Sequence, residues 1–178
     1  MADPQPGIED VASFMCDRSL MLVTAESCTG GLIAATLADM PGAGQLLDCA
    51  FVTYSPEAKK RCLSVKPETL ESCNLTSEAV AREMAVGALK NSRANVAVSN
   101  TGVVDGTDRD IPAGTQCFAW AFKAEASGQP SRSALFSETR RFAGDRTEIR
   151  TAAARYALER IPHYFLIQAK SAADPRSG

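Results

Sequence analysis

The chain has 178 residues and a formal net charge of −2 at pH 7, with 19 basic and 21 acidic residues. That length predicts one domain with its own core, and the mixed charges offer no basic patch for nucleic acid or an anionic membrane. No apolar run approaches the roughly 20 residues of a membrane span, and the first residues lack the basic and apolar regions of a signal peptide. We therefore expect a cytoplasmic protein that binds neither nucleic acid nor membrane.

The single histidine, His163, excludes whole classes of reaction. A Ser-His-Asp triad needs a histidine beside its serine, and zinc hydrolases usually need two or more. His163 falls in a late helix beside Pro162, where we expect a surface or interface residue. The six cysteines show no CxxC spacing and no Cys/His pair, so reduced thiols are expected and no metal site. In an enzyme, proton transfer would then use Lys, Tyr, Asp, Glu or Cys.

In chain order, residues 1–6 are expected to be disordered, and the domain is expected to span 7–168. A first helix is predicted over 7–18. Residues 20–40 then predict a strand, a turn and a helix, because a short apolar run gives way to small polar residues. Apolar residues afterwards recur every three or four positions. The tail 169–178 is expected to be disordered.

The turn of this unit carries Ser27, Cys28, Thr29, Gly30 and Gly31. Backbone N–H groups at the start of a helix have no partner within the helix, and they can hold a phosphate or the oxyanion of an acyl-transfer intermediate. The two glycines let a ligand approach the backbone closely. The alternative interpretation is a polar turn in which Thr29 is a plain N-cap.

The later elements alternate between the two kinds of secondary structure. Strands are predicted over 49–54, 95–99, 115–123 and 133–142, and helices over 55–63, 76–91 and 144–169, the last kinked or broken at Pro162. The polar loop 103–114 is interpreted as solvent-exposed for most of its length. This alternation predicts a three-layer α/β/α sandwich in a single domain.

Reactive side chains stand at the ends of predicted strands. These are Ser27, Tyr54 with Lys59 one turn into the following helix, and Thr101. Strand ends at one edge of an α/β sheet can converge on one pocket. Without a histidine, Lys59 is the natural base for Ser27, provided that burial lowers its pKa from ~10.4 toward ~7–8. Tyr54 could relay a proton or position the lysine, whereas the plainer alternative for Lys59 is a solvated surface lysine.

Arg146 follows Gly144 at the start of the last helix. A guanidinium there could clamp a phosphate. A surface ion pair with Asp145 or Glu148 is an equally plain interpretation.

Several ordered motifs resemble the CinA C-terminal family, which includes bacterial nicotinamide mononucleotide deamidases. They are TAESCTGGLIAATLAD, FVTYSPEAK, SEAVAREMAVGAL, a strand ending in TG, FAGDR and a final helix ending in ARYAL. The resemblance covers about residues 7–165. It implies hydrolysis of the nicotinamide amide of nicotinamide mononucleotide to nicotinic acid mononucleotide and ammonia, a step of pyridine nucleotide salvage, without a cofactor.

The resemblance also implies roles for individual residues. Ser27 corresponds to the nucleophile, Lys59 to the base, and Tyr54 to the tyrosine beside it. Thr101 and Arg146 correspond to positions that bind the substrate or support catalysis. The small-molecule mononucleotide is the expected partner.

The glycine-rich segments of the family are only partly matched. The turn Thr29-Gly30-Gly31 is expected to supply backbone donors to the oxyanion or the phosphate, and Gly102 to lie against the substrate. After Gly102, however, the family commonly carries G-x-A-G-P-x-G-G followed by K-P-x-G. This chain reads VVDGTDRDIPAG, with Ile111 in place of the lysine.

Because this loop departs from the family pattern, two alternatives stay open. The protein could be a nucleotide-binding relative with weak or no amidase activity, or an amidase that acts on a different substrate. A homo-oligomer is expected in either case.

Overall fold

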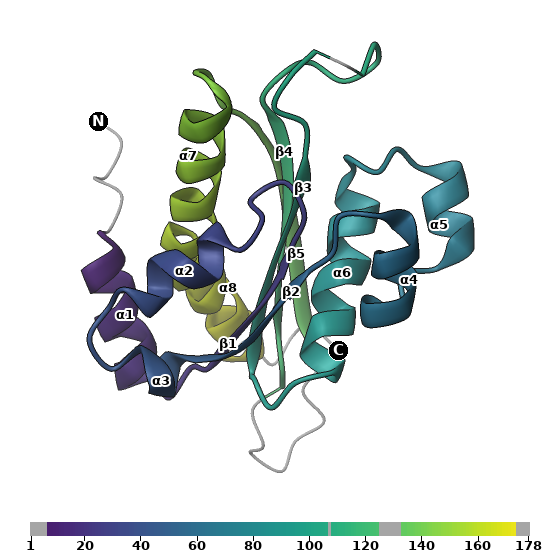
Figure 1. Ribbon diagram of the computed structural model, residues 1–178. Helices are drawn as coiled ribbons and strands as arrows, with labels where there is room; N and C mark the ends of the chain where they lie inside the picture. The colour runs from purple at the N-terminus through teal and green to yellow at the C-terminus, as the bar shows by residue number, and fades with distance from the viewer. Residues whose placement is uncertain (1–6, 107, 125–132, 174–178) are drawn as a thin grey trace.

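The computed structural model describes residues 7–106, 108–124 and 133–173. Five strands form one sheet in the order β2-β1-β3-β4-β5, with helices on both faces (Figure 1). The strands are β1 Leu22–Glu26, β2 Leu47–Val52, β3 Val96–Gly102, β4 Thr115–Phe122 and β5 Ala134–Arg141. The helices are α1 Ile8–Asp17, α2 Leu32–Ala38, α3 Ala43–Leu46, α4 Pro56–Leu63, α5 Pro67–Ser72, α6 Glu78–Lys90, α7 Arg146–Glu159 and α8 Ile161–Ala173. The predicted three-layer α/β/α sandwich is confirmed.

Three strands of the sheet end at the same edge as parallel neighbours. β1 pairs in parallel with β2 and with β3, so that Glu26, at the end of β1, is level with Val52 of β2 and Asn100 of β3. β4 and β5 continue the sheet in antiparallel fashion. Because two reversals restore the direction, β5 also ends at this edge, and α7 begins there.

The sheet separates two hydrophobic cores. On one face, α6 packs against β1, β3, β4 and β5, with α4 and α5 outside it (Figure 1). The face of α6 that carries Val80, Met84, Gly87 and Ala88 is buried against the sheet and α4. A Cβ atom on Gly87 would lie only 1.8 Å from the Leu63 carbonyl oxygen, so this glycine permits α4 to approach α6 closely. On the other face, α1, α2, α7 and α8 cover the second core.

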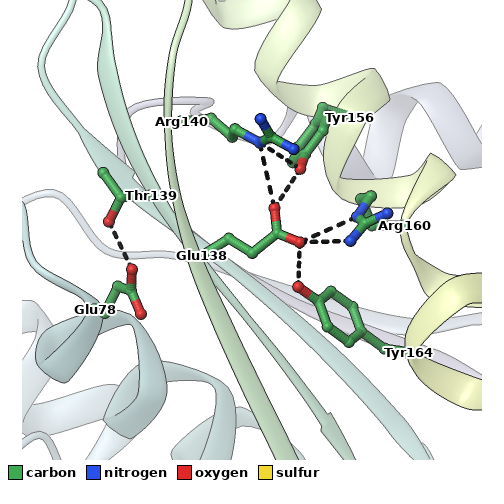
Figure 2. Close-up of polar contacts among 7 residues, drawn as sticks. All are labelled: Glu78, Glu138, Thr139, Arg140, Tyr156, Arg160 and Tyr164. Carbon is green, nitrogen blue, oxygen red and sulfur yellow. Dashed lines mark hydrogen bonds and ion pairs between the residues drawn. The ribbon is translucent and has the colours of Figure 1, made fainter. Parts of the chain in front are cut away.

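A polar cluster ties α7 and α8 to the edge strand β5 (Figure 2). The Glu138 carboxylate accepts hydrogen bonds from the hydroxyls of Tyr156 and Tyr164 and from the Arg160 guanidinium. Burial raises the pKa of Glu138, but the hydrogen bonds from Tyr156, Tyr164 and Arg160 outweigh it and lower the pKa to about 2. The carboxylate is therefore charged at neutral pH, and it fixes the two helices that carry the C-terminal part of the second core.

Several predicted boundaries were wrong. β1 begins two residues later than expected and continues through Glu26, because a central strand paired on both sides is buried whether or not its residues are apolar. α3 is a one-turn helix where only a loop was expected. The expected tail is helical as far as Ala173. Residues 1–6 and 174–178 lie outside the described residues, and within the described ranges no helix is long and apolar enough to cross a membrane.

The last predicted helix is two helices. α7 ends at Glu159 and α8 begins at Ile161, so the break falls immediately before Pro162, as expected for a residue that lacks an N–H and crowds the preceding turn. His163 is exposed on α8, as its position beside Pro162 suggested.

Candidate active site

A cavity of about 690 Å³ opens at the carboxyl ends of the parallel strands. Its lining includes Ser27 after β1, Lys59 on α4, Thr101 and Gly102 at the end of β3, and Arg146 at the start of α7. This volume lies within the range of small-molecule sites, and the position is the one expected for ligands in open α/β sheets. The structure thus brings together side chains that lie as far apart as 119 positions in the sequence.

The helix start at α4 directs the lysine toward the serine. The Ser55 hydroxyl caps this helix by accepting the Ala58 N–H at 3.1 Å, and Pro56 occupies the first turn. Lys59 is one turn further on. Since helical side chains lean toward the helix N-terminus, its amine reaches back to the end of β2 and to Ser27.

The amine of Lys59 contacts three oxygens. Its Nζ atom lies 2.6 Å from the Thr53 carbonyl oxygen, 3.2 Å from the Tyr54 carbonyl oxygen and 3.1 Å from the Ser27 hydroxyl. None of the three belongs to a carboxylate. The lysine side chain is only 1% exposed, and this burial lowers its pKa from 10.5 to about 8. The alternative interpretation, a solvated surface lysine, is therefore wrong.

In its neutral form this amine has the hydrogen-bonding pattern of a base. It can donate its two hydrogens to the carbonyls of Thr53 and Tyr54, which leaves its lone pair facing the Ser27 hydroxyl. Ser27 itself is nine-tenths buried, and its N–H donates to the Asn100 carbonyl of β3. The serine is thus held at the end of the β1–β3 ladder with its hydroxyl toward the lysine.

Cys28, the neighbouring thiol, lies in a different environment. Burial raises its pKa, and this outweighs the Gln116 amide, which donates to Sγ at 3.3 Å, and the more distant Arg146 and Arg150 charges. A protonated thiol is a poor nucleophile. Ser27 has the Lys59 amine beside its hydroxyl to take its proton, and this contact favours Ser27 over Cys28 as the attacking group.

The start of α2 is capped by a residue that the sequence analysis did not single out. Glu26 is fully buried, and its carboxylate accepts the Thr29 hydroxyl at 2.7 Å. The same carboxylate accepts the N–H groups of Gly31, Ile33 and Ala34 at 2.9 to 3.0 Å. Thr29 is therefore not the N-cap, and a protein carboxylate already satisfies the helix N-terminus that was expected to hold an anion.

The expected donors of the turn are likewise engaged. The Thr29 N–H donates to the Asn100 side chain at 3.0 Å, the Gly30 N–H to the Ser27 carbonyl at 3.1 Å, and the Gly31 N–H to Glu26. The prediction that these three amides face the substrate is wrong for this reason. Among the described contacts of the turn, the Cys28 N–H is the amide that makes no hydrogen bond to a protein acceptor.

Arg150, one turn into α7, holds the same turn from the opposite side. Its Nε donates to the Cys28 carbonyl at 2.9 Å and its Nη2 to the Thr29 carbonyl at 3.1 Å. A Cβ atom on Gly30 would lie 2.9 Å from this guanidinium, which explains a glycine with φ of 61° at this position. The turn is therefore clamped between Glu26 and Arg150.

The other candidate residues occupy different parts of the cavity. The Tyr54 side chain is 56% exposed, and the contact of this residue with Lys59 is made by its backbone carbonyl. The geometry therefore does not support a role for the Tyr54 hydroxyl in positioning Lys59. The Thr101 hydroxyl donates to the Leu75 carbonyl at 2.9 Å. Arg146 is 59% exposed and pairs with Asp105 rather than with Asp145 or Glu148.

Four buried or half-buried polar residues of the site were missed. They are Glu26, Asn100, Gln116 and Arg150. The Asn100 side chain connects the turn to β4, because it accepts from the Thr29 N–H and donates to the Gln116 side chain at 2.9 Å. A carboxylate directly before a small-residue turn and a helix start was a usable signal for Glu26 as a cap. The loop 103–114, interpreted as largely solvent-exposed, also contributes to the cavity through Val103, Val104, Asp105, Asp108 and Arg109.

Metal ligands do not gather at this cavity. Across the described ranges, no group of three His, Cys, Asp or Glu side chains is arranged to hold a metal ion. All six cysteines are free thiols, of which Cys28 and Cys117 are buried.

The fold and the site define the class of this protein: an α/β domain in which a buried serine–lysine pair faces a cavity at the carboxyl ends of parallel strands. The chain belongs to the CinA C-terminal domain family, whose sequence model it matches over residues 5–165. The resemblance inferred from the motifs is confirmed.

Relatives in this family carry different names, some of which state an activity. The chain is 40% identical over 160 residues to the nicotinamide-nucleotide amidohydrolase PncC of Escherichia coli strain K12, covering 89% of this chain and 92% of that protein. It is 42% identical over 130 residues to a CinA-like protein of Chlorobium phaeobacteroides, covering 72% of this chain and 31% of that protein. Several curated relatives are longer in this way, and the chain spans 28% to 37% of their length.

Solved structures agree with this assignment. The crystal structure of a competence/damage inducible protein from Agrobacterium tumefaciens superposes with a TM-score of 0.77 at 38% sequence identity, covering 90% of this chain and 98% of that chain.

Proposed function

We propose that this protein is a nicotinamide-nucleotide amidohydrolase, which hydrolyses the amide of nicotinamide mononucleotide to nicotinic acid mononucleotide and ammonia. The observation that carries the proposal is the Lys59 amine, buried, with a pKa of about 8, and 3.1 Å from the Ser27 hydroxyl. The 40% identity to the E. coli amidohydrolase, over nearly the full length of both chains, supports the same substrate.

The proposed reaction passes through an acyl-enzyme. Neutral Lys59 takes the proton of Ser27 as Oγ attacks the carboxamide carbon, and the oxyanion that forms accepts the unengaged N–H of Cys28. The resulting ammonium of Lys59 returns its proton to the departing amine, which leaves as ammonia. Lys59 then takes a proton from water as the water oxygen attacks the ester carbon. When the bond to Oγ breaks, the ammonium of Lys59 returns this proton to Oγ, which restores the serine and releases nicotinic acid mononucleotide.

The surrounding residues support this chemistry without reacting. The carbonyls of Thr53 and Tyr54 orient the amine, and Glu26 and Arg150 hold the turn that carries Ser27 and the Cys28 amide. The exposed ring of Tyr54 lies beside Gly30 and lines the cavity, where it offers a flat apolar surface to the pyridine ring. Arg146, one of the two arginines that line the cavity, is the cation that we assign to the phosphate.

The test is ammonia release from nicotinamide mononucleotide by the purified protein and two single variants. Ser27→Ala should lower kcat by at least about a thousandfold, as is usual when a nucleophile is removed. Cys28→Ala, the matched control, removes a buried neighbouring thiol but keeps the backbone amide and should retain most activity. Near-normal turnover by Ser27→Ala, with loss in Cys28→Ala, would overturn the assignment of the nucleophile. Failure of the folded wild-type protein to release ammonia would overturn the substrate.

A further inference from the structure

The cavity lining carries acidic as well as basic side chains, rather than the purely positive lining that a phosphate would favour. Its charged side chains are Lys59, Asp105, Asp108, Arg109 and Arg146. Lys59 is largely engaged with neutral oxygens at the buried end of the site. The remaining four, two acids and two arginines, line the part formed by the loop 103–114 and the start of α7.

Arg146 is already paired with one of these acids. Its Nη1 lies 3.7 Å from Oδ2 of Asp105, and both side chains are more than half exposed. Asp105 belongs to the loop whose sequence departs from the family pattern of paired glycines. An anionic group that approaches Arg146 must therefore compete with a carboxylate supplied by this chain's own loop.

The second acid adds to the same effect. The Asn74 amide donates to the carboxylate of Asp108 at 2.9 Å, and the Asp110 N–H donates to its other oxygen at 2.9 Å. These bonds lower the pKa of Asp108 and keep it ionised at neutral pH. A phosphate beside Arg146 would thus enter a region in which two carboxylates offset the two guanidinium groups.

We infer that Asp105 is a specificity-determining residue, which competes with the anionic group of the substrate for Arg146. Asp105 thereby reduces the factor by which the site prefers a phosphorylated amide to the same amide without phosphate. The inference rests on the proposed amidohydrolase function and concerns its substrate class. In this view the altered loop determines how much a negative charge on the substrate strengthens its binding.

The test compares two substrates that differ only in the phosphate, nicotinamide mononucleotide and nicotinamide riboside. Asp105→Asn removes the competing charge and keeps the size of the side chain. It should raise the ratio of kcat/KM for the mononucleotide to kcat/KM for the riboside by about two- to fivefold, the range expected for an exposed ion pair. The increase should shrink in high salt, because exposed charges are screened.

Two controls isolate the interaction. Asp110→Asn makes the same charge change in the same loop, at a residue that does not line the cavity, and should leave the ratio unchanged. In an Arg146→Gln background, Asp105→Asn should no longer raise the ratio, since the group for which it competes is gone. An unchanged ratio in Asp105→Asn, or an equal increase in Asp110→Asn, would overturn the inference.

Binding measurements separate this inference from the function on which it rests. Calorimetry with the mononucleotide on Ser27→Ala and on Ser27→Ala with Asp105→Asn should show the tighter dissociation constant in the double variant. If the wild-type protein releases no ammonia while this tightening is seen, the reaction is wrong and the role of Asp105 stands. If the mononucleotide is neither hydrolysed nor bound, both are overturned.

Discussion

The lowered pKa of Lys59 makes the pH dependence of the reaction the sharpest consequence of the structure. With a pKa of about 8, about one-tenth of the lysine is neutral at pH 7 and about nine-tenths at pH 9. If the neutral amine is the base, kcat/KM for ammonia release from nicotinamide mononucleotide should rise roughly ninefold to tenfold between these values. A lysine with its ordinary pKa would instead continue to gain activity well above pH 10.

The same shift has a consequence for stability. The unfolded chain holds the lysine proton up to about pH 10.5, whereas the folded protein holds it only up to about pH 8. The free energy of unfolding should therefore fall as the pH is lowered from about 10.5 to about 8, by about 3 kcal/mol in total. Lys59→Met, which removes the charge but keeps an unbranched apolar side chain, should abolish this dependence and be the more stable protein at pH 7.

The assay is a pH–rate profile between pH 6 and 10, together with urea unfolding at pH 7 and pH 9.5. Lys59→Arg serves as the control for charge, because a guanidinium stays protonated and cannot act as a base. It should be inactive across the whole range. A profile that is flat between pH 7 and 9, or measurable activity in Lys59→Arg, would refute the assignment of Lys59 as the base.

Two further predictions test what holds the fold around the site. Glu138→Gln should lower the free energy of unfolding by about 2 kcal/mol at pH 7. The difference from wild type should disappear as the pH falls from about 5 toward 2, because the carboxylate stabilises the fold only while it is ionised. Urea unfolding at pH 7 and pH 3 checks this, and an equal loss at both pH values contradicts it. Gly87→Ala should lower the free energy of unfolding by about 1–3 kcal/mol, since its Cβ would overlap the Leu63 carbonyl. Gly44→Ala, with no atom within 4 Å of the added Cβ, should cost little. Thermal melts of both variants check this, and equal melting temperatures contradict it.

The sequence and the structure agree best where local pattern and tertiary packing demand the same thing. The face of α6, with Val80 and Met84 toward the sheet, was predictable because one amphipathic stripe needs one apolar surface. The end of β1 was not. Thr24 and Glu26 read as the beginning of a polar turn, but neighbours on both sides supply the hydrogen bonds of a strand. Periodicity cannot reveal such pairing, because it depends on residues far away in the chain.

The features of the site also fall into those that the local sequence predicts and those that depend on the tertiary structure. The order of residues alone identified Ser27 and Lys59 as the pair to consider, since a strand–turn–helix unit and a capped helix start can be read locally. The structure supplied the burial that lowers the pKa of the lysine, and it corrected the donors of the turn. Those amides proved to be engaged by Glu26 and Asn100, which no spacing rule connects to them.

By itself, then, the sequence determined the α/β class, the family, the strand–turn–helix unit and the candidate pair Ser27 and Lys59, because each follows from the order of neighbouring residues. Only the tertiary structure decided the desolvation of Lys59, the clamping of the turn by Arg150 and the pairing of Arg146 with Asp105. The physical reason is that a pKa, a satisfied amide or an ion pair depends on which groups surround an atom. In this protein those groups come from strands and helices that lie far apart in the chain and meet at one edge of the sheet.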